Sequence, residues 1–212
     1  MGMKPFLPIV PVMILFLAGC HLAIERDITI ESGQSVRSSI NVIDGDITIG
    51  SGCFIRSSCR TVDGDIEVGR ESTVTNLQSV DGTIYVGRDV VVRRDVELVD
   101  GDIICRQGVT VGGNINAIDG RIEISNTVVE HDITTYAADM FLDDRSRVEG
   151  DIIIRRSTDD HNRQRQVRIE ITGGSVVMGD ILNKDENVDV RVYLSDGGRI
   201  EGRARDVEVI RR

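Results

Sequence analysis

The feature that most constrains this chain is a short phrase, Val/Ile-Asp-Gly, that returns at an almost constant interval. Successive aspartates are separated by 19, 18, 19 and 19 residues, and an earlier, degenerate copy starts at Glu25. The aspartates of the phrase are Asp44, Asp63, Asp81, Asp100 and Asp119. A fixed short period is typical of a solenoid, in which each repeat is one coil that packs on its neighbours.

Apolar residues alternate with other residues after each Asp-Gly pair, which predicts strands with one buried face. These inward pairs are Ile47 and Ile49, Ile66 and Val68, Ile84 and Val86, Ile103 and Cys105, and Ile122 and Ile124. Three further columns are expected to point inward. One precedes each turn directly (Ile43, Val62, Val80, Val99, Ile118), one lies four residues before it (Ile40, Cys59, Leu77, Val96, Ile115), and one is paired (Cys53 with Ile55, Ser72 with Val74, Val90 with Val92, Val109 with Val111).

Three short strands separated by corners within 19 residues make one coil of a parallel β-helix. We therefore predict an all-β, single-domain, right-handed parallel β-helix of about eight coils over residues 25–212. At about 4.8 Å a coil, such a rod is roughly 40 Å long. Glycine follows each aspartate of the phrase because this corner needs a positive φ.

The period is interrupted after Ile124. The next turn-like phrase begins at Glu149, 30 residues after Asp119, so we expect about eleven residues to project from the rod within 126–147. A second, wholly polar excursion is expected at 155–166. Loops on a rigid scaffold often carry function, so the arginines of this loop are our candidate contact site for an anionic envelope partner, with a merely solvated loop as the alternative. They are Arg155, Arg156, Arg163 and Arg165.

The N-terminus carries a positive charge at Lys4, a short apolar run, and then Leu-Ala-Gly-Cys ending at Cys20. The run is too short and wrongly flanked for a stable membrane span, and its three prolines disfavour a globular helix. A buried N-terminal strand or helix is the alternative. The segment resembles the signal peptide of bacterial lipoproteins. The resemblance implies removal of residues 1–19, acylation of Cys20 with palmitate-type chains, and a short tether over 20–24.

Two consequences follow for location. The residue after Cys20 is His21 rather than Asp, which the resemblance associates with the outer membrane, at its periplasmic face or the cell surface. Without Lys4 the chain has 24 basic and 35 acidic residues, a net charge of about −11. Such a charge argues against nucleic acid as a partner and against electrostatic adhesion to anionic lipid, so attachment should come from the acyl chains.

Cysteines and aspartates leave alternatives open. Cys53, Cys59 and Cys105 fall in inward columns and are expected to be small buried hydrophobes, but a Cys53–Cys59 disulfide is chemically allowed outside the cytoplasm. The aspartates of the phrase would stack in each coil and either accept backbone N–H groups of their own turns or bind a divalent cation weakly. A second, partial column is expected at Asp46, Asp65, Asp102 and Asp151.

Catalysis is not expected. The histidines, at positions 21, 131 and 161, are scattered, and there is neither a Ser/His/Asp grouping nor a phosphate-cradling glycine loop. We expect no cofactor. Aromatic residues that would form a sugar platform are few, although a divalent-cation-binding or polysaccharide-binding module remains an alternative.

The phrases Thr61–Ile66 and Val148–Ile152, with the closing segment Val190–Ser195, resemble uncharacterised secreted bacterial proteins with TVNG-type β-helical repeats. They resemble, more distantly, the bactofilins, whose β-helices assemble end to end. We expect a non-enzymatic, lipid-anchored envelope protein that offers a structural or binding surface to an envelope glycan or protein. End-to-end polymerisation is the alternative that the bactofilin resemblance implies. Charged residues near both ends favour a monomer or small oligomer.

Overall fold

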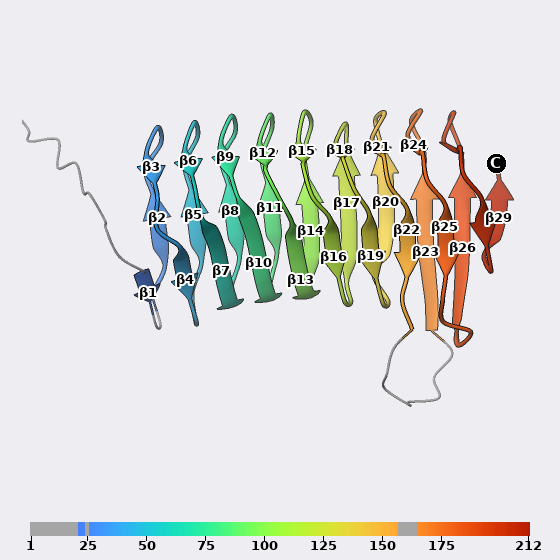
Figure 1. Ribbon diagram of the computed structural model, residues 1–212, viewed down its shortest axis with the longest axis horizontal. Helices are drawn as coiled ribbons and strands as arrows, with labels where there is room; N and C mark the ends of the chain where they lie inside the picture. The colour runs from blue at the N-terminus through green and yellow to red at the C-terminus, as the bar shows by residue number, and fades with distance from the viewer. Residues whose placement is uncertain (1–20, 24–25, 157–164) are drawn as a thin grey trace, which may run out of the picture.

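The computed structural model describes residues 21–23, 26–156 and 165–212, and these form an all-β solenoid built from parallel strands (Figure 1). Sheet A contains β1 (His21–Ala23), β4 (Ile40–Val42), β7 (Ser58–Asp63), β10 (Asn76–Asp81), β13 (Val96–Asp100), β16 (Ile115–Ala117), β19 (Ile133–Thr135), β22 (Ile152–Ile154), β25 (Ile181–Asn183) and β28 (Ala204–Arg205). Sheet B contains β2 (Ile28–Ile30), β5 (Ile47–Ile49), β8 (Ile66–Val68), β11 (Ile84–Val86), β14 (Asp102–Cys105), β17 (Arg121–Ser125), β20 (Asp139–Asp143), β23 (Arg165–Ile171), β26 (Val188–Leu194) and β29 (Glu208–Arg211). Sheet C contains β3 (Ser35–Val36), β6 (Phe54–Ile55), β9 (Thr73–Val74), β12 (Val91–Val92), β15 (Thr110–Val111), β18 (Val128–Val129), β21 (Arg147–Val148), β24 (Val176–Val177) and β27 (Arg199–Ile200).

Each coil contributes one strand to each sheet, in the order A, B, C. Coil 1 is β1–β3, and the numbering continues to coil 9, which is β25–β27; β28 and β29 begin a tenth. Register follows the repeat, so that Leu77 lies beside Val96 and Ile84 beside Ile103. The predicted parallel β-helix is therefore confirmed, with about one coil more than expected. Nine coils at about 4.8 Å give a rod of roughly 43 Å.

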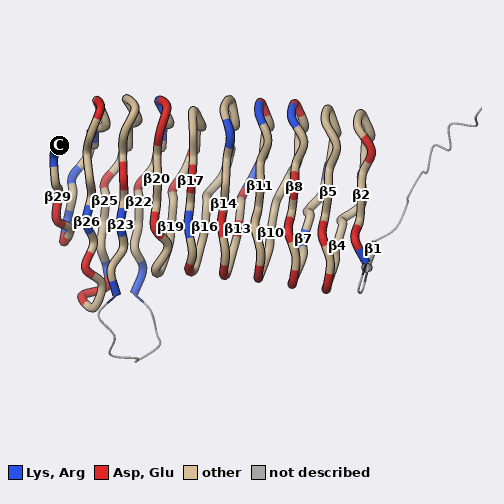
Figure 2. Tube along the Cα trace, turned by 180° about the vertical axis from the view of Figure 1, so that it is seen from behind, with Lys and Arg blue, Asp and Glu red and all other residues tan. Residues whose placement is uncertain are grey.

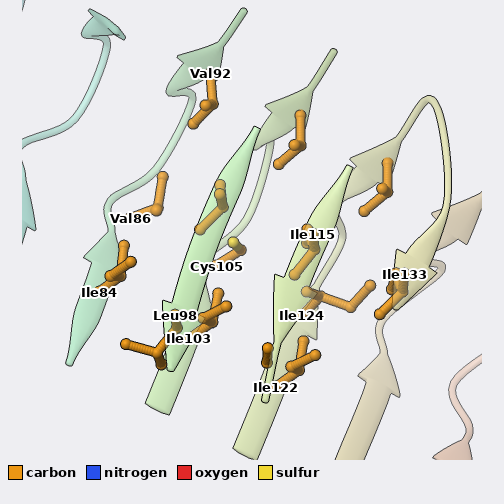
Figure 3. Close-up of a cluster of buried hydrophobic side chains, with 14 of the residues drawn as sticks. Ile84, Val86, Val92, Leu98, Ile103, Cys105, Ile115, Ile122, Ile124 and Ile133 are labelled. Atoms are coloured by element: carbon orange, nitrogen blue, oxygen red, sulfur yellow. The ribbon is translucent and has the colours of Figure 1, made fainter. Parts of the chain in front are cut away.

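The core is a stack of β-branched and other apolar side chains that repeat from coil to coil (Figure 3). Ile84, Ile103 and Ile122 lie in one such row and have no exposed surface. The inward pairs predicted after the turns are confirmed, as are the paired column of sheet C and the column four residues before the turn. Burial of these rows along the axis supplies the main driving force for the stack.

One predicted column is wrong. Ile43, Val62, Val80, Val99 and Ile118 point outward and are 39–45% exposed. Sheet A strands alternate with period two, so a buried Ile40 places Val42 inside and Ile43 outside. The inner positions of this column are taken instead by Val42, Thr61, Ser79, Leu98 and Ala117.

The excursion expected within 126–147 is also wrong, because this segment forms β18 to β20 and begins β21 in regular register. Asp151 lies at the corner between sheets C and A, beside Asp132, and not in the column of Asp102. The 30-residue interval from Asp119 to Glu149 therefore joins a corner between sheets A and B to a corner between sheets C and A, and it does not measure an insertion. The actual insertion separates β22 from β23, since Met140 pairs with Ile169. It coincides with the excursion expected at 155–166, of which 157–164 lies outside the described residues.

Side-chain carboxylates and amides form hydrogen bonds between successive coils at the corner between sheets C and A. The Oδ1 atom of Asp132 accepts the backbone N–H of Asp151 at 2.8 Å, and Oδ1 of Asp151 accepts that of Asp180 at 2.7 Å. We call this set the corner row; its members are Asn76, Asp95, Asn114, Asp132, Asp151 and Asp180. Each of its side chains satisfies a backbone donor one coil further along.

Glycine is required at the Asp-Gly corner between sheets A and B. Gly101 has a φ of +124°, and a Cβ built there would lie 2.0 Å from the carbonyl oxygen of Gly82. The corner therefore needs glycine both for its backbone conformation and for the close approach of stacked coils.

Candidate functional site

The outer face of sheet A carries an unusual line of apolar side chains, which we call the exposed row. The register of the strands places Val80 beside Val99, and Ile118 beside Tyr136. The row comprises Ile43, Val62, Val80, Val99, Ile118 and Tyr136. Single exposed aliphatic residues are ordinary, but a continuous line of them over several coils is typical of a contact surface.

A groove of about 540 Å³ runs beside this row over coils 3 to 7 and reaches the start of the polar excursion. Its apolar wall is formed by the exposed row from Val80 to Tyr136, and its floor by small or apolar residues such as Ser79 and Ala117. The opposite wall is polar and consists of Arg60, Gln78, Glu97, Asn116 and Thr134. The volume lies within the range of ligand sites in proteins.

Hydrogen bonds order one half of the polar wall. The guanidinium of Arg60 donates from Nε to Oε1 of Gln78 at 2.7 Å, and Nε2 of Gln78 donates to Oε2 of Glu97 at 2.6 Å. Within the described ranges, the side chains of Asn116 and Arg155 make no hydrogen bond or ion pair. The half of the groove toward coil 8 therefore offers an amide and a guanidinium to a ligand, beside the ring of Tyr136.

The three described arginines of the candidate loop are not brought together in the groove. Arg155 follows β22 and lines the end of the groove, whereas Arg156 is exposed and Arg165 begins β23. Arg163 lies outside the described residues. Of the three described arginines, Arg155 alone joins the groove, as the residue stacked beyond Tyr136.

The aspartates of the repeated phrase form an exposed acidic line at the corner between sheets A and B (Figure 2). Asp119 accepts the N–H of Gly120 at 2.7 Å, which is the expected bond within its own turn. In the partial second column, Oδ1 of Asp46 instead accepts the N–H of Asp65, one coil further on, at 2.8 Å. Across the residues the structure describes, no group of three or more His, Cys, Asp or Glu side chains is placed to hold a metal ion. The geometry thus gives no support to the cation alternative.

Cys53, Cys59 and Cys105 are buried and free, so the Cys53–Cys59 disulfide is not formed. Burial raises the pKa of the Cys59 and Cys105 thiols to about 12, and they behave as core hydrophobes. The lipidation candidate Cys20 lies outside the described residues. In the part of the chain that the structure does describe, no helix is long and apolar enough to cross a membrane.

Sequence reasoning missed the groove because it assigned the exposed row to the core. Strict two-residue alternation from the column of Ile40 would have placed Val62 or Val99 outside. The signal was present in the sequence, but the apolar character of these side chains outweighed it.

The fold defines the chain as a parallel β-solenoid with an amphipathic groove along one sheet. Comparisons with family models, curated proteins and solved structures find no match to it.

Proposed function

We propose that this chain is a non-enzymatic, lipid-anchored protein of the bacterial envelope, located at the outer membrane, that binds an elongated envelope component in the groove of sheet A. The observation that carries the proposal is the exposed row, because an apolar line along the rod matches a partner that extends along the same axis. Acyl chains at Cys20 would hold the rod at the membrane.

The lining of the groove supports binding of a partner with both polar and apolar faces, such as a glycan strand or an extended peptide. The exposed row offers apolar contact, while Asn116 and Arg155 offer hydrogen bonds. The strands beneath are paired on both sides within sheet A, so such a partner would dock through side chains.

The same lining supports binding rather than hydrolysis. Among the described residues, Glu97 is the sole carboxylate that lines the groove, and no histidine does. Glycoside hydrolysis generally needs two carboxylates, and acyl transfer needs a nucleophile with a base beside it. The proposal therefore requires no cofactor.

The test compares two double variants, each of which replaces two outward-facing aliphatic residues by serine. Val99→Ser with Ile118→Ser alters the groove, while Val91→Ser with Val128→Ser alters the outer face of sheet C. Val99 is 39% exposed and Val91 is 40% exposed, so these two positions are closely matched, while Val128 is half-buried. We expect the groove pair to lose cosedimentation with purified peptidoglycan, and the sheet C pair to retain it.

The arginines provide a second arm. Arg155→Ser should weaken binding, whereas Arg156→Ser with Arg163→Ser and Arg165→Ser should leave it unchanged. Equal binding by the wild type and the groove pair would overturn the assignment of the groove. Loss of binding only in the arginine triple variant would restore the loop as the contact site.

A second candidate function is end-to-end assembly into filaments. Half-buried hydrophobic residues pack against the core at both terminal coils, Ile28 and Val36 at one end and Ile200, Val207 and Val209 at the other. The described part of the chain places no helix over either end. Outer strands of a sheet have unpaired backbone groups that favour addition of another strand.

Electron microscopy of the purified protein tests this alternative. Filaments in the wild type that disappear in Val209→Lys, but persist in Val91→Lys, would favour assembly through the coil ends. A monodisperse particle at high protein concentration would exclude it.

A further inference from the structure

Four arginines lie at one edge of the N-terminal coils, and two of them stack on one aromatic ring. Arg37, Arg56 and Arg93 each follow directly after a strand of sheet C, and Arg94 follows Arg93. The Cζ atoms of Arg56 and Arg93 lie 5.1 and 4.8 Å from the centroid of the Phe54 ring. We call these residues (Arg37, Arg56, Arg93 and Arg94, with Phe54) the arginine cluster. Stacking on the ring orients two guanidinium groups without neutralising them.

The cluster has no counter-charge of its own. All eight ion pairs in the described ranges involve residues from Arg121 onward, so the four arginines have no carboxylate within 4.0 Å. The nearest acidic residue in sequence, Asp95, directs Oδ1 to the backbone N–H and side-chain amide of Asn114. The four guanidinium groups are exposed to solvent.

Charge is distributed unevenly along the row of residues that directly follow the strands of sheet C. The row that follows sheet C is basic in coils 1, 2 and 4, at Arg37, Arg56 and Arg93. From coil 6 the same row contains Glu130 and Glu149, and Glu201 in coil 9. The N-terminal end of this edge is therefore positive on a molecule whose net charge is negative.

We propose that the arginine cluster binds the phosphate groups of anionic lipids, so that the first four coils lie against the membrane surface. The inference deepens the membrane attachment proposed above and rests on it for the location of the protein. Coil 1 begins one residue after Cys20, and coil 4 lies about 15 Å further along the rod (Figure 1). Guanidinium groups suit phosphate, and a half-exposed aromatic ring suits the membrane interface.

The overall negative charge does not oppose this arrangement. Electrostatic attraction to a charged membrane decays over about 8–10 Å at physiological ionic strength, so only nearby groups contribute. The acidic residues of the row lie at the opposite end, away from the anchored coil.

The chain contains no tryptophan, which allows a direct test. In Phe54→Trp the indole at position 54 is the single strong fluorophore and retains the capacity to stack with arginine. The full-length, acylated protein is incorporated into vesicles of phosphatidylcholine alone and of phosphatidylcholine with phosphatidylglycerol. We expect a blue shift of emission only with phosphatidylglycerol, and its reversal in high salt.

Two charge-matched variants in this background identify the groups responsible. Arg37→Ser with Arg56→Ser and Arg93→Ser removes the cluster, while Arg147→Ser with Arg191→Ser and Arg199→Ser removes three ion-paired arginines. One arginine near an anionic surface contributes about fivefold, so the first variant should reduce the docking equilibrium roughly a hundredfold. The second should leave it within a few-fold of the parent.

The outcomes separate this inference from the anchoring proposal. Flotation of the wild type with neutral vesicles reports on the acyl anchor. If the protein does not float, the phosphatidylglycerol-dependent shift is measured with the protein added from solution to both lipid mixtures. The same emission in both lipid mixtures, or equal loss in both arginine variants, would overturn lipid binding by the cluster. A blue shift produced by soluble glycerol phosphate alone would also overturn it, by showing a site for free phosphate.

Discussion

Buried thiols make stability depend on pH at the scale of single residues. Burial raises the pKa of the Cys105 thiol from an ordinary 9.0 to about 12, so the folded state keeps this proton to higher pH than the unfolded chain. The contribution of this thiol to the stability of the folded state is therefore fully present below about pH 9 and is lost as the pH rises from 9 toward 12. Cys59 follows the same course.

We predict that Cys105→Val loses less stability than the wild type between pH 8 and pH 11. Valine suits the site because Val86 occupies the adjacent position of the same row. Urea unfolding at the two pH values measures the difference. Parallel pH dependence in the two proteins would contradict the assignment of the titration to this thiol.

The corner row gives a second prediction at the residue scale. Asp132→Ala removes the acceptor for the backbone N–H of Asp151 and should lower the free energy of unfolding by about 1–3 kcal/mol. Asp132→Asn keeps a carbonyl oxygen there and should recover most of the loss. Asp100→Ala, at the exposed acidic corner, should change stability by about 0.5 kcal/mol or less and is the control.

At the scale of the strand, the direction of each side chain separates core from groove. Ile103 has no exposed surface on β14, whereas Val99 is 39% exposed on β13 of the same coil. Ile103→Lys should prevent soluble expression because it buries an unpaired charge. Val99→Lys should fold, with a change in the free energy of unfolding of about 0.5 kcal/mol. Soluble expression and thermal melting of the two variants measure this difference. Failure of Val99→Lys to fold would show that the side chains of the exposed row point into the core.

The error in locating the insertion also belongs to this scale. The sequence Gly-Asp-Ile occurs at the corner between sheets A and B, as at Gly64–Ile66, and at the corner between sheets C and A, as at Gly150–Ile152. Both corners need a tight approach of stacked coils followed by a buried residue. Local sequence therefore does not distinguish them, and only strand pairing does.

At the scale of the whole molecule, attachment to the membrane is the first matter to test. Labelled fatty acid should enter the wild-type protein and not Cys20→Ala, because the thiol of Cys20 is the proposed acylation site. The variant should remain unprocessed or become extractable without detergent. Fractionation of the wild type will distinguish the outer from the inner membrane, and release of the wild type by a detergent-free wash would argue against an acyl anchor.

The amino-acid sequence by itself determined the repeat, the strands and most of the core. A 19-residue period with alternating apolar positions leaves few structures other than a stacked β-coil, since each coil buries its apolar face only against the next. Columns such as Ile47–Ile66–Ile84 were predictable because they obey one local rule in every coil.

Only the tertiary structure decided what lies outside the rod. The exposed row, the groove beside it and the arginine cluster arise from residues about 19 positions apart, which parallel pairing brings into lines along the axis. Arg56 and Arg93 are 37 residues apart in the sequence, and they meet at the ring of Phe54 only when the coils stack. Hydrophobic character alone does not give the direction of a side chain; the pleat of the strand does, and the register then determines its neighbours.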